Sequence, residues 1–208
     1  MKIQQILIII IFTIPVFGYS QSENYDLLVK QVCTDLNIEK IKNLPADKIQ
    51  KELINLGTEI RNKNNVIADK IASEIKENNP SYNDSEILRE YLTSFYFHAI
   101  DNCSDFYELT LIPLGDCPKS NNTLTLLEKE TEKFINNNSD KEYKELNDLL
   151  VRHLTTIIFN NIPTVETDYK DGIADPLLMS DMTNYLFHKS KDYLKINIAI
   201  QIEKYIGD

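Results

Sequence analysis

Residues 86–102 read EILREYLTSFYFHAIDN, and their pattern is the clearest structural signal in the chain. Folded as a helix, this stretch would carry apolar side chains around most of its circumference: Ile87, Leu88, Tyr91, Leu92, Phe95, Tyr96, Phe97, Ala99 and Ile100. A helix that is apolar nearly all round is normally buried in the middle of a domain. We therefore expect a central buried helix over 86–102, with its start at Asp84 or Ser85.

Along most of the remaining chain, apolar residues recur at steps of three and four, which is the spacing of one helix face. These stripes cover the ranges 25–36, 49–75, 124–135, 146–158 and 178–186. Five glycines and seven prolines are few for 208 residues, and they favour long regular elements over a turn-rich sandwich. The sequence therefore predicts an all-α, up-and-down helical bundle of six to eight helices.

Local signals indicate where several of these helices begin or break. Gly57 is a candidate break within the second stripe. Ser139 and Glu142 have the spacing of a capping box. Asp175 followed by Pro176 is typical of an N-cap and a first helical turn.

Two segments are ambiguous between helix and strand. Residues 106–112 fit either a short helix or an extended piece. Residues 194–202 alternate apolar and polar side chains, which is the period of a strand. A strand needs a partner, however, and an isolated hairpin is marginally stable in water. We favour a helix over 194–206, and a short extended piece at the C-terminus is the alternative.

Residues 1–20 have the features of a secretory signal peptide. Lys2 precedes an apolar run over residues 6–17, and small residues around Tyr19 offer a cleavage site after Ser20. The run is shorter than the roughly 20 residues that span a bilayer, although an uncleaved anchor is the alternative. We predict a secreted or periplasmic location. We also predict that the mature chain, residues 21–208, forms a single helical domain that does not span a membrane.

The charge balance narrows the class of partner. The chain has 22 Lys and Arg against 32 Asp and Glu, and the loss of Lys2 with the leader leaves 21 against 32, a net charge of about −11. An acidic protein repels phosphate backbones and anionic lipid head groups. We therefore expect no nucleic-acid or membrane-surface partner.

Three cysteines, in an oxidising compartment, are most simply counted as one disulfide and one remaining thiol. We predict the pair Cys103–Cys117, because Pro113 and Gly115 lie between the two and allow the chain to fold back. The alternative is a bridge from Cys33 to one of the other two. Otherwise Cys33, which lies in an apolar helical stripe, is a buried thiol.

The three histidines lie on three different predicted helices, and helical bundles build metal sites from facing helices. His98, with Asp101 three residues later, would be joined by His153 and His188. The patterns His-Glu-x-x-His and Glu-x-x-His are absent, and His153 lies in an apolar stripe that is typical of a core histidine. We therefore predict no metal ion and no cofactor.

Two further groups of residues are candidates for ligand binding or catalysis. The acidic segment 168–175 resembles a calcium loop, but the residues at three ligand positions fail the EF-hand pattern, so we interpret it as an acidic turn and helix cap. A nucleophile and base pair of Cys103 and His98 is disfavoured, because the predicted compartment favours a disulfide.

No catalytic fingerprint such as a nucleophile elbow or a phosphate-binding loop occurs in the sequence. The aromatic run Tyr91, Phe95, Tyr96 and Phe97 could line a pocket for an apolar ligand, but we favour core packing as its explanation. We predict an exported, non-catalytic helical protein without catalytic residues that binds a protein partner or a small apolar ligand. The alternative is an exported metal-dependent hydrolase that uses the histidines.

Overall fold

The computed structural model describes residues 22–44 and 46–206, and the predicted leader, residues 1–20, lies outside these residues. The described part contains ten α-helices, two short 3-10 helices and no strand. In chain order the elements are α2 (Ser22–Asp35), α3 (Ile38–Lys42), α4 (Ala46–Asn78), α5 (Asp84–Asn102), α6 (Ser104–Leu111), η1 (Ile112–Leu114), α7 (Asn122–Asn137), α8 (Tyr143–Asn160), α9 (Ile162–Asp168), η2 (Gly172–Ala174), α10 (Pro176–Lys189) and α11 (Lys191–Ile206). The prediction of an all-α bundle is confirmed. The ten helices exceed the predicted six to eight, because α3, α6 and α9 are too short to produce a clear apolar stripe in the sequence.

Backbone contacts divide the chain into two compact units. The first comprises the described residues up to Pro113 together with those from Gln201 onward, and the second comprises Leu114–Ile200. The formation of one domain by residues 21–208 stays a prediction. None of the helices in the described residues combines the length and the apolar character needed to cross a bilayer.

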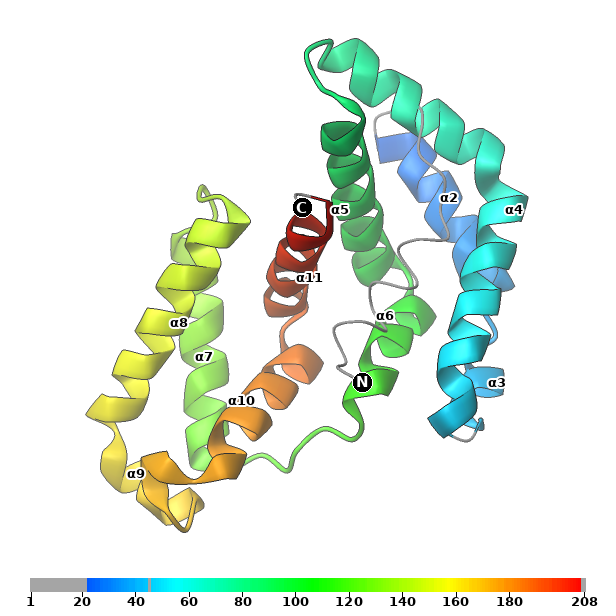
Figure 1. Ribbon diagram of the computed structural model, residues 1–208. Coiled ribbons are helices and arrows are strands. Elements are labelled where there is room, and N and C mark those ends of the chain that lie inside the picture. Colours follow the sequence, from blue (N-terminus) through cyan, green and yellow to red (C-terminus); the bar gives the residue numbers. More distant parts are fainter. Residues whose placement is uncertain (1–21, 45, 207–208) are drawn as a thin grey trace. The chain divides into compact units, whose positions relative to one another are not determined.

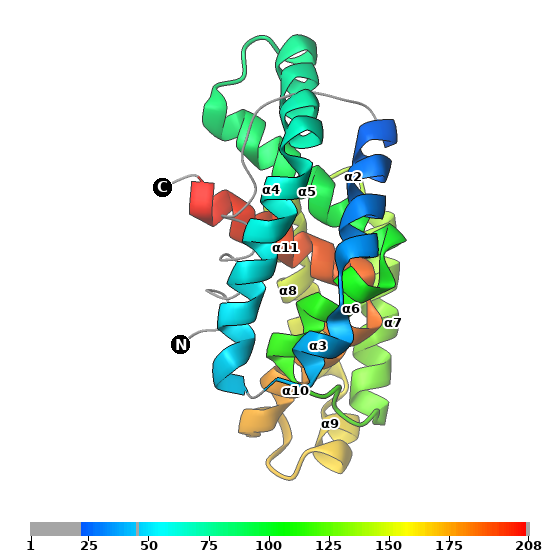
Figure 2. The same ribbon diagram turned by 90° about the vertical axis from the view of Figure 1, so that its right-hand side faces the viewer.

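In the first unit, α5 packs against α2, α4 and α6 (Figures 1 and 2). It starts at Asp84, as predicted, behind a capping box in which Asn83 and Glu86 satisfy each other's backbone groups. Its buried residues are Ile87, Tyr91, Leu92, Phe95, Tyr96, Ala99 and Ile100. The prediction of a central buried helix over 86–102 is therefore confirmed for this unit.

Helix α4 runs for 33 residues without the break that Gly57 suggested. A glycine inside a helix costs about 1 kcal/mol relative to alanine. The buried stripe that follows Gly57 outweighs this cost, since burial of each large apolar side chain contributes about 1.5–3 kcal/mol. The buried apolar members of this stripe are Ile60, Ala68, Ile71, Ala72 and Ile75.

The disulfide joins Cys33 to Cys103, with a Cα–Cα distance of 5.8 Å, and Cys117 is a free thiol. The predicted pair Cys103–Cys117 is therefore wrong, and the alternative bridge from Cys33 is present. The reason lies in the packing of α2 against α5, which brings the last turn of α2 to the C-cap of α5, where Cys103 lies. Cys117 belongs to the second unit.

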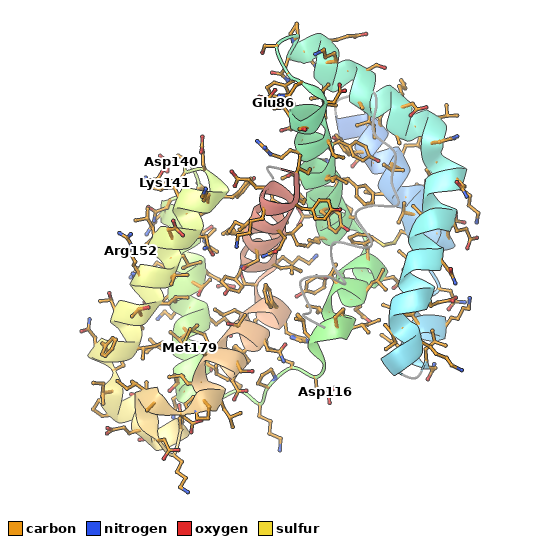
Figure 3. All side chains as sticks on the ribbon, viewed as in Figure 1. Glu86, Asp116, Asp140, Lys141, Arg152 and Met179 are labelled. Carbon is orange, nitrogen blue, oxygen red and sulfur yellow. A yellow bond between two sulfur atoms is a disulfide. The ribbon has the colours of Figure 1, made fainter. Side chains whose placement is uncertain are left out.

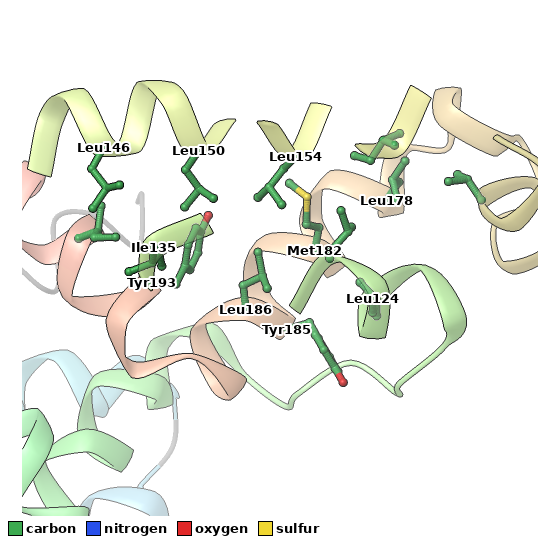
Figure 4. Packing of buried hydrophobic residues seen from close by; sticks show 14 of the residues in the cluster. Leu124, Ile135, Leu146, Leu150, Leu154, Leu178, Met182, Tyr185, Leu186 and Tyr193 are labelled. Carbon is green, nitrogen blue, oxygen red and sulfur yellow. The ribbon is translucent and has the colours of Figure 1, made fainter. Parts of the chain in front are cut away.

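The second unit is built from α7, α8, α9, α10 and the first part of α11 around a shared apolar core (Figure 4). The buried side chains of this core include Leu124, Ile135, Leu146, Leu150, Leu154, Leu178, Met182, Tyr185, Leu186 and Tyr193. The predicted capping box at the start of α8 does not form. The helix begins at Tyr143, and its N-cap, Glu142, makes no side-chain capping hydrogen bond.

Both ambiguous segments are helical. Residues 104–111 form α6, and the alternating segment lies within α11. Alternate residues of a helix are 200° apart, so the alternation produces two stripes on opposite faces of α11. Tyr193, Ile196 and Ile200 form the stripe that joins the core of the second unit, and the stripe with Leu194, Ile198 and Ile202 is also buried. Burial on two faces therefore explains a pattern that is otherwise typical of a strand.

Replacing both Cys33 and Cys103 with serine is expected to lower the free energy of unfolding by roughly 4 kcal/mol, because the bond closes a separation of 70 residues in the unfolded chain. Urea denaturation measures this change. The control Cys117→Ser, which leaves the bond intact, is expected to change stability by less than about 1 kcal/mol. A double-serine variant as stable as the unmodified chain would contradict the assigned pairing.

Candidate functional site

Local interactions fix the start of α10 firmly in the second unit. Asp175 is its N-cap, with Oδ1 accepting a hydrogen bond of 2.9 Å from the backbone N–H of Leu177. Pro176 occupies the first helical position, where its missing N–H is tolerated. Leu178 is buried in the core of the unit. The predicted helix start at Asp175 and Pro176 is confirmed.

Three large apolar side chains around this helix start are exposed to solvent. The exposed fractions are 43% for Ile173, 59% for Leu177 and 56% for Met179. Figure 3 labels Met179 on α10. Successive side chains point about 100° apart around a helix, so a core position for Leu178 turns both its neighbours outward. Ala174 and Pro176 are exposed as well. We call residues 173–179 the apolar segment.

The carboxylates of the predicted acidic turn act as helix caps. Asp168 Oδ2 accepts hydrogen bonds from the backbone N–H and the hydroxyl of Thr123, at 2.6 and 2.8 Å, at the start of α7. Asp175 caps α10 in the same way. Among the described residues, no group of three or more His, Cys, Asp or Glu side chains is arranged to hold a metal ion. The interpretation of 168–175 as an acidic turn and helix cap fits these contacts.

The three histidines are engaged in separate local contacts. His98 stacks on Tyr25 with ring centroids 5.1 Å apart, and its Nδ1 lies 3.0 Å from the carbonyl oxygen of Ser94. His153 stacks on Phe134 at 4.7 Å, and its Nε2 lies 3.4 Å from Glu130. His188 Nδ1 lies 2.9 Å from the carbonyl oxygen of Asn184.

These contacts do not place the histidines in one site. His98 and Asp101 belong to the first unit, and the other two histidines belong to the second. The stack of His153 on Phe134 joins α8 to α7, and the His153 side chain, which is 29% exposed, lies at the edge of the core rather than inside it as its apolar stripe suggested.

Most of the aromatic run belongs to the core of the first unit. The ring of Phe95 contacts Tyr96 and Phe106 edge-on, with centroids 5.7 Å apart in both pairs. Tyr91 and Tyr96 are fully buried, and burial raises the pKa of both phenols well above the usual range. Phe97 is partly exposed.

Two open grooves follow the exposed face of α2 in the first unit. Their volumes are about 420 and 480 Å³, and they share Lys30 and Thr34 in their walls. The first also contains the exposed side chain of Leu27, and the second is bordered by Cys33. Their walls include side chains of both charges, which gives these grooves no preference for one class of ligand.

The free thiol of Cys117 lies in the segment that leads into α7. Burial raises the pKa of this thiol, so it stays protonated at neutral pH and is a poor nucleophile. Nearby, the hydroxyl of Tyr185 donates to Glu128 Oε2 at 3.0 Å and shares a hydrogen bond of 3.1 Å with Ser120. These contacts fasten the segment to α10. Cys103 cannot act as a nucleophile with His98, since its sulfur is in the disulfide.

The exposed apolar segment was missed by the sequence analysis, although one signal was available. Leu177, Leu178 and Met179 are consecutive apolar residues in a helix, and three consecutive residues span 200° of its circumference. A core that covers only one side of the helix can fully bury the middle residue but not both of its neighbours. The pattern therefore already predicts exposed apolar side chains at the start of this helix.

Comparisons with protein-family models, with curated proteins and with solved structures gave no match to this chain.

Replacing Asp175 with alanine is expected to lower the free energy of unfolding by about 1 kcal/mol, because the N-cap hydrogen bond to Leu177 is lost. Asp175→Asn keeps a capping oxygen and serves as the matched control, with an expected change within about 0.5 kcal/mol. Thermal denaturation of the two variants compares them directly. Equal stabilities would show that this cap does not hold the segment.

Replacing Tyr96 with phenylalanine is expected to leave stability unchanged or to raise it by up to about 1 kcal/mol. Its buried hydroxyl has no hydrogen-bond partner among the described residues, so the substitution removes an uncompensated polar group. The control Tyr185→Phe removes a hydroxyl that bonds to Ser120 and Glu128, and it is expected to cost about 1–2 kcal/mol. Urea denaturation of both variants tests this contrast, and a larger loss for Tyr96→Phe would refute it.

Proposed function

We propose that this chain is an exported, non-catalytic helical protein that acts by binding another protein, with the apolar segment as its contact surface. The observation that carries the proposal is the exposure of Ile173, Leu177 and Met179 within seven residues. Single exposed apolar side chains are common on protein surfaces, but a local concentration of large ones is typical of an interaction site.

The way the segment is held supports a role in recognition. Asp175 caps α10 and Leu178 is fixed in the core, so the exposed side chains project from a rigid helix start. A rigid surface loses little conformational entropy when a partner binds. Apolar anchors presented in this way can supply most of the binding energy of an interface.

Two other functions receive less support. A small apolar ligand would need a lined cavity, whereas Phe95 and Tyr96 of the aromatic run pack against each other and Phe106. A metal-dependent hydrolase would need converging histidines, whereas His98, His153 and His188 have separate local partners. These packed aromatic rings and separately engaged histidines favour binding of a protein over both alternatives.

Export is supported by the disulfide and by the predicted leader. Disulfides persist in oxidising compartments and are rare in the cytosol. The bond between Cys33 and Cys103 therefore agrees with the location that residues 1–20 predict.

Photo-crosslinking in the native host tests the proposal. A benzophenone amino acid replaces Leu177 in the full chain, and the exported fraction is irradiated. We expect a covalent adduct with one defined protein, joined to a chain that begins at Gln21. Intact-mass measurement identifies both the adduct and the first residue of the exported chain.

The control places the same amino acid at Val66 of α4, an apolar residue that is 76% exposed in the first unit. No defined adduct is expected there. Adducts of equal yield at both positions, or none at Leu177 under any growth condition, would refute the proposed contact surface.

A further inference from the structure

Three carboxylates border the apolar segment. Glu166 of α9 lies beside Gly172, the residue before its start, since a Cβ placed on Gly172 would be 3.1 Å from Glu166 Cγ. Asp171 lies two residues before Ile173 in the chain. Asp181 lies one helical turn beyond Leu177, on the same face of α10.

A buried phenol, Tyr169, lies next to the segment. Burial raises the pKa of Tyr169, and the carboxylates of Asp181, Asp168 and Asp175 raise it further. Carboxylates from α9, the N-cap of α10 and α10 itself therefore act at one place in the second unit.

These carboxylates differ in what they do for the fold. Asp168 and Asp175 accept hydrogen bonds from backbone N–H groups and cap helices. Glu166 and Asp171 are exposed on the surface. Exposed carboxylates around apolar anchors match the usual anatomy of an interface, with an apolar centre and a polar rim.

On the basis of the function proposed above, we infer that the partner of the apolar segment presents an apolar recess bordered by Lys or Arg side chains. The recess would receive Leu177, which is 59% exposed. The basic rim would meet Glu166, Asp171 and Asp181. Complementary charge also speeds association and excludes acidic partners, and the net charge of −10 for the whole chain acts in the same direction.

Selection of displayed random peptides on the full, disulfide-bonded chain tests this inference without knowledge of the natural partner. We expect enriched peptides to combine an aliphatic or aromatic anchor with flanking Lys or Arg. Leu177→Asp is expected to weaken their binding at least tenfold, because it replaces the apolar anchor with a charge. An increase from 50 to 300 mM NaCl is expected to weaken binding severalfold.

Charge-neutral variants separate the rim from the anchor. Glu166→Gln with Asp171→Asn is expected to weaken peptide binding about three- to tenfold, since each exposed charge pair contributes little by itself. The matched control, Glu132→Gln with Asp148→Asn, removes two exposed carboxylates from α7 and α8 and is expected to change binding less than about twofold. Circular dichroism of each variant confirms that it is folded.

The outcomes distinguish the two proposals. Peptides that depend on Leu177 but are neutral or acidic, or whose binding is unaffected by salt, would overturn the basic rim and leave the proposed contact surface intact. A selection that yields no peptide dependent on Leu177 would overturn both.

Discussion

The bond between Cys33 and Cys103 is the constraint on which the first unit most depends. It joins the last turn of α2 to the residue that both ends α5 and precedes α6, so one covalent link holds three helices. The closed separation is 70 residues, and this length makes the loss of unfolded-state entropy large. The bond also persists only where thiols are oxidised, so the stability of this unit and the proposed export depend on the same chemistry.

The features predicted correctly from the sequence are those set by neighbouring residues or by the helical period. The stripe of α5 and the capping pair Asp175–Pro176 are read directly from spacing, and both are present. The sequence did not predict features that depend on packing between distant residues. The partner of Cys103 is chosen by the contact of α2 with α5, and the continuity of α4 past Gly57 is decided by burial of the residues that follow. The exposure of Leu177 was implied by pattern, but which of three neighbours is buried is set by the core.

The polar groups of the second unit show how an acidic chain uses some of its carboxylates to build the fold. Asp168, which follows Thr123 by 45 positions in the sequence, accepts a hydrogen bond from the Thr123 N–H and caps the start of α7. Asp175 caps the start of α10. Each carboxylate stabilises a helix terminus, where the partial positive charge of the backbone favours an anion. The acidic turn is therefore part of the fold, whereas Glu166 and Asp171 next to the apolar segment are exposed on the surface.

This placement also explains how the chain tolerates an exposed apolar segment. Two copies that met through Leu177 and Met179 would bring their acidic rims together, and like charges in contact oppose association. A partner with basic groups around its recess meets no such repulsion. In the proposed complex the same carboxylates would therefore disfavour self-association and favour one class of partner, which is how charge gives specificity when apolar contact provides the affinity. On this proposal, selectivity would come from the rim rather than from the apolar anchor.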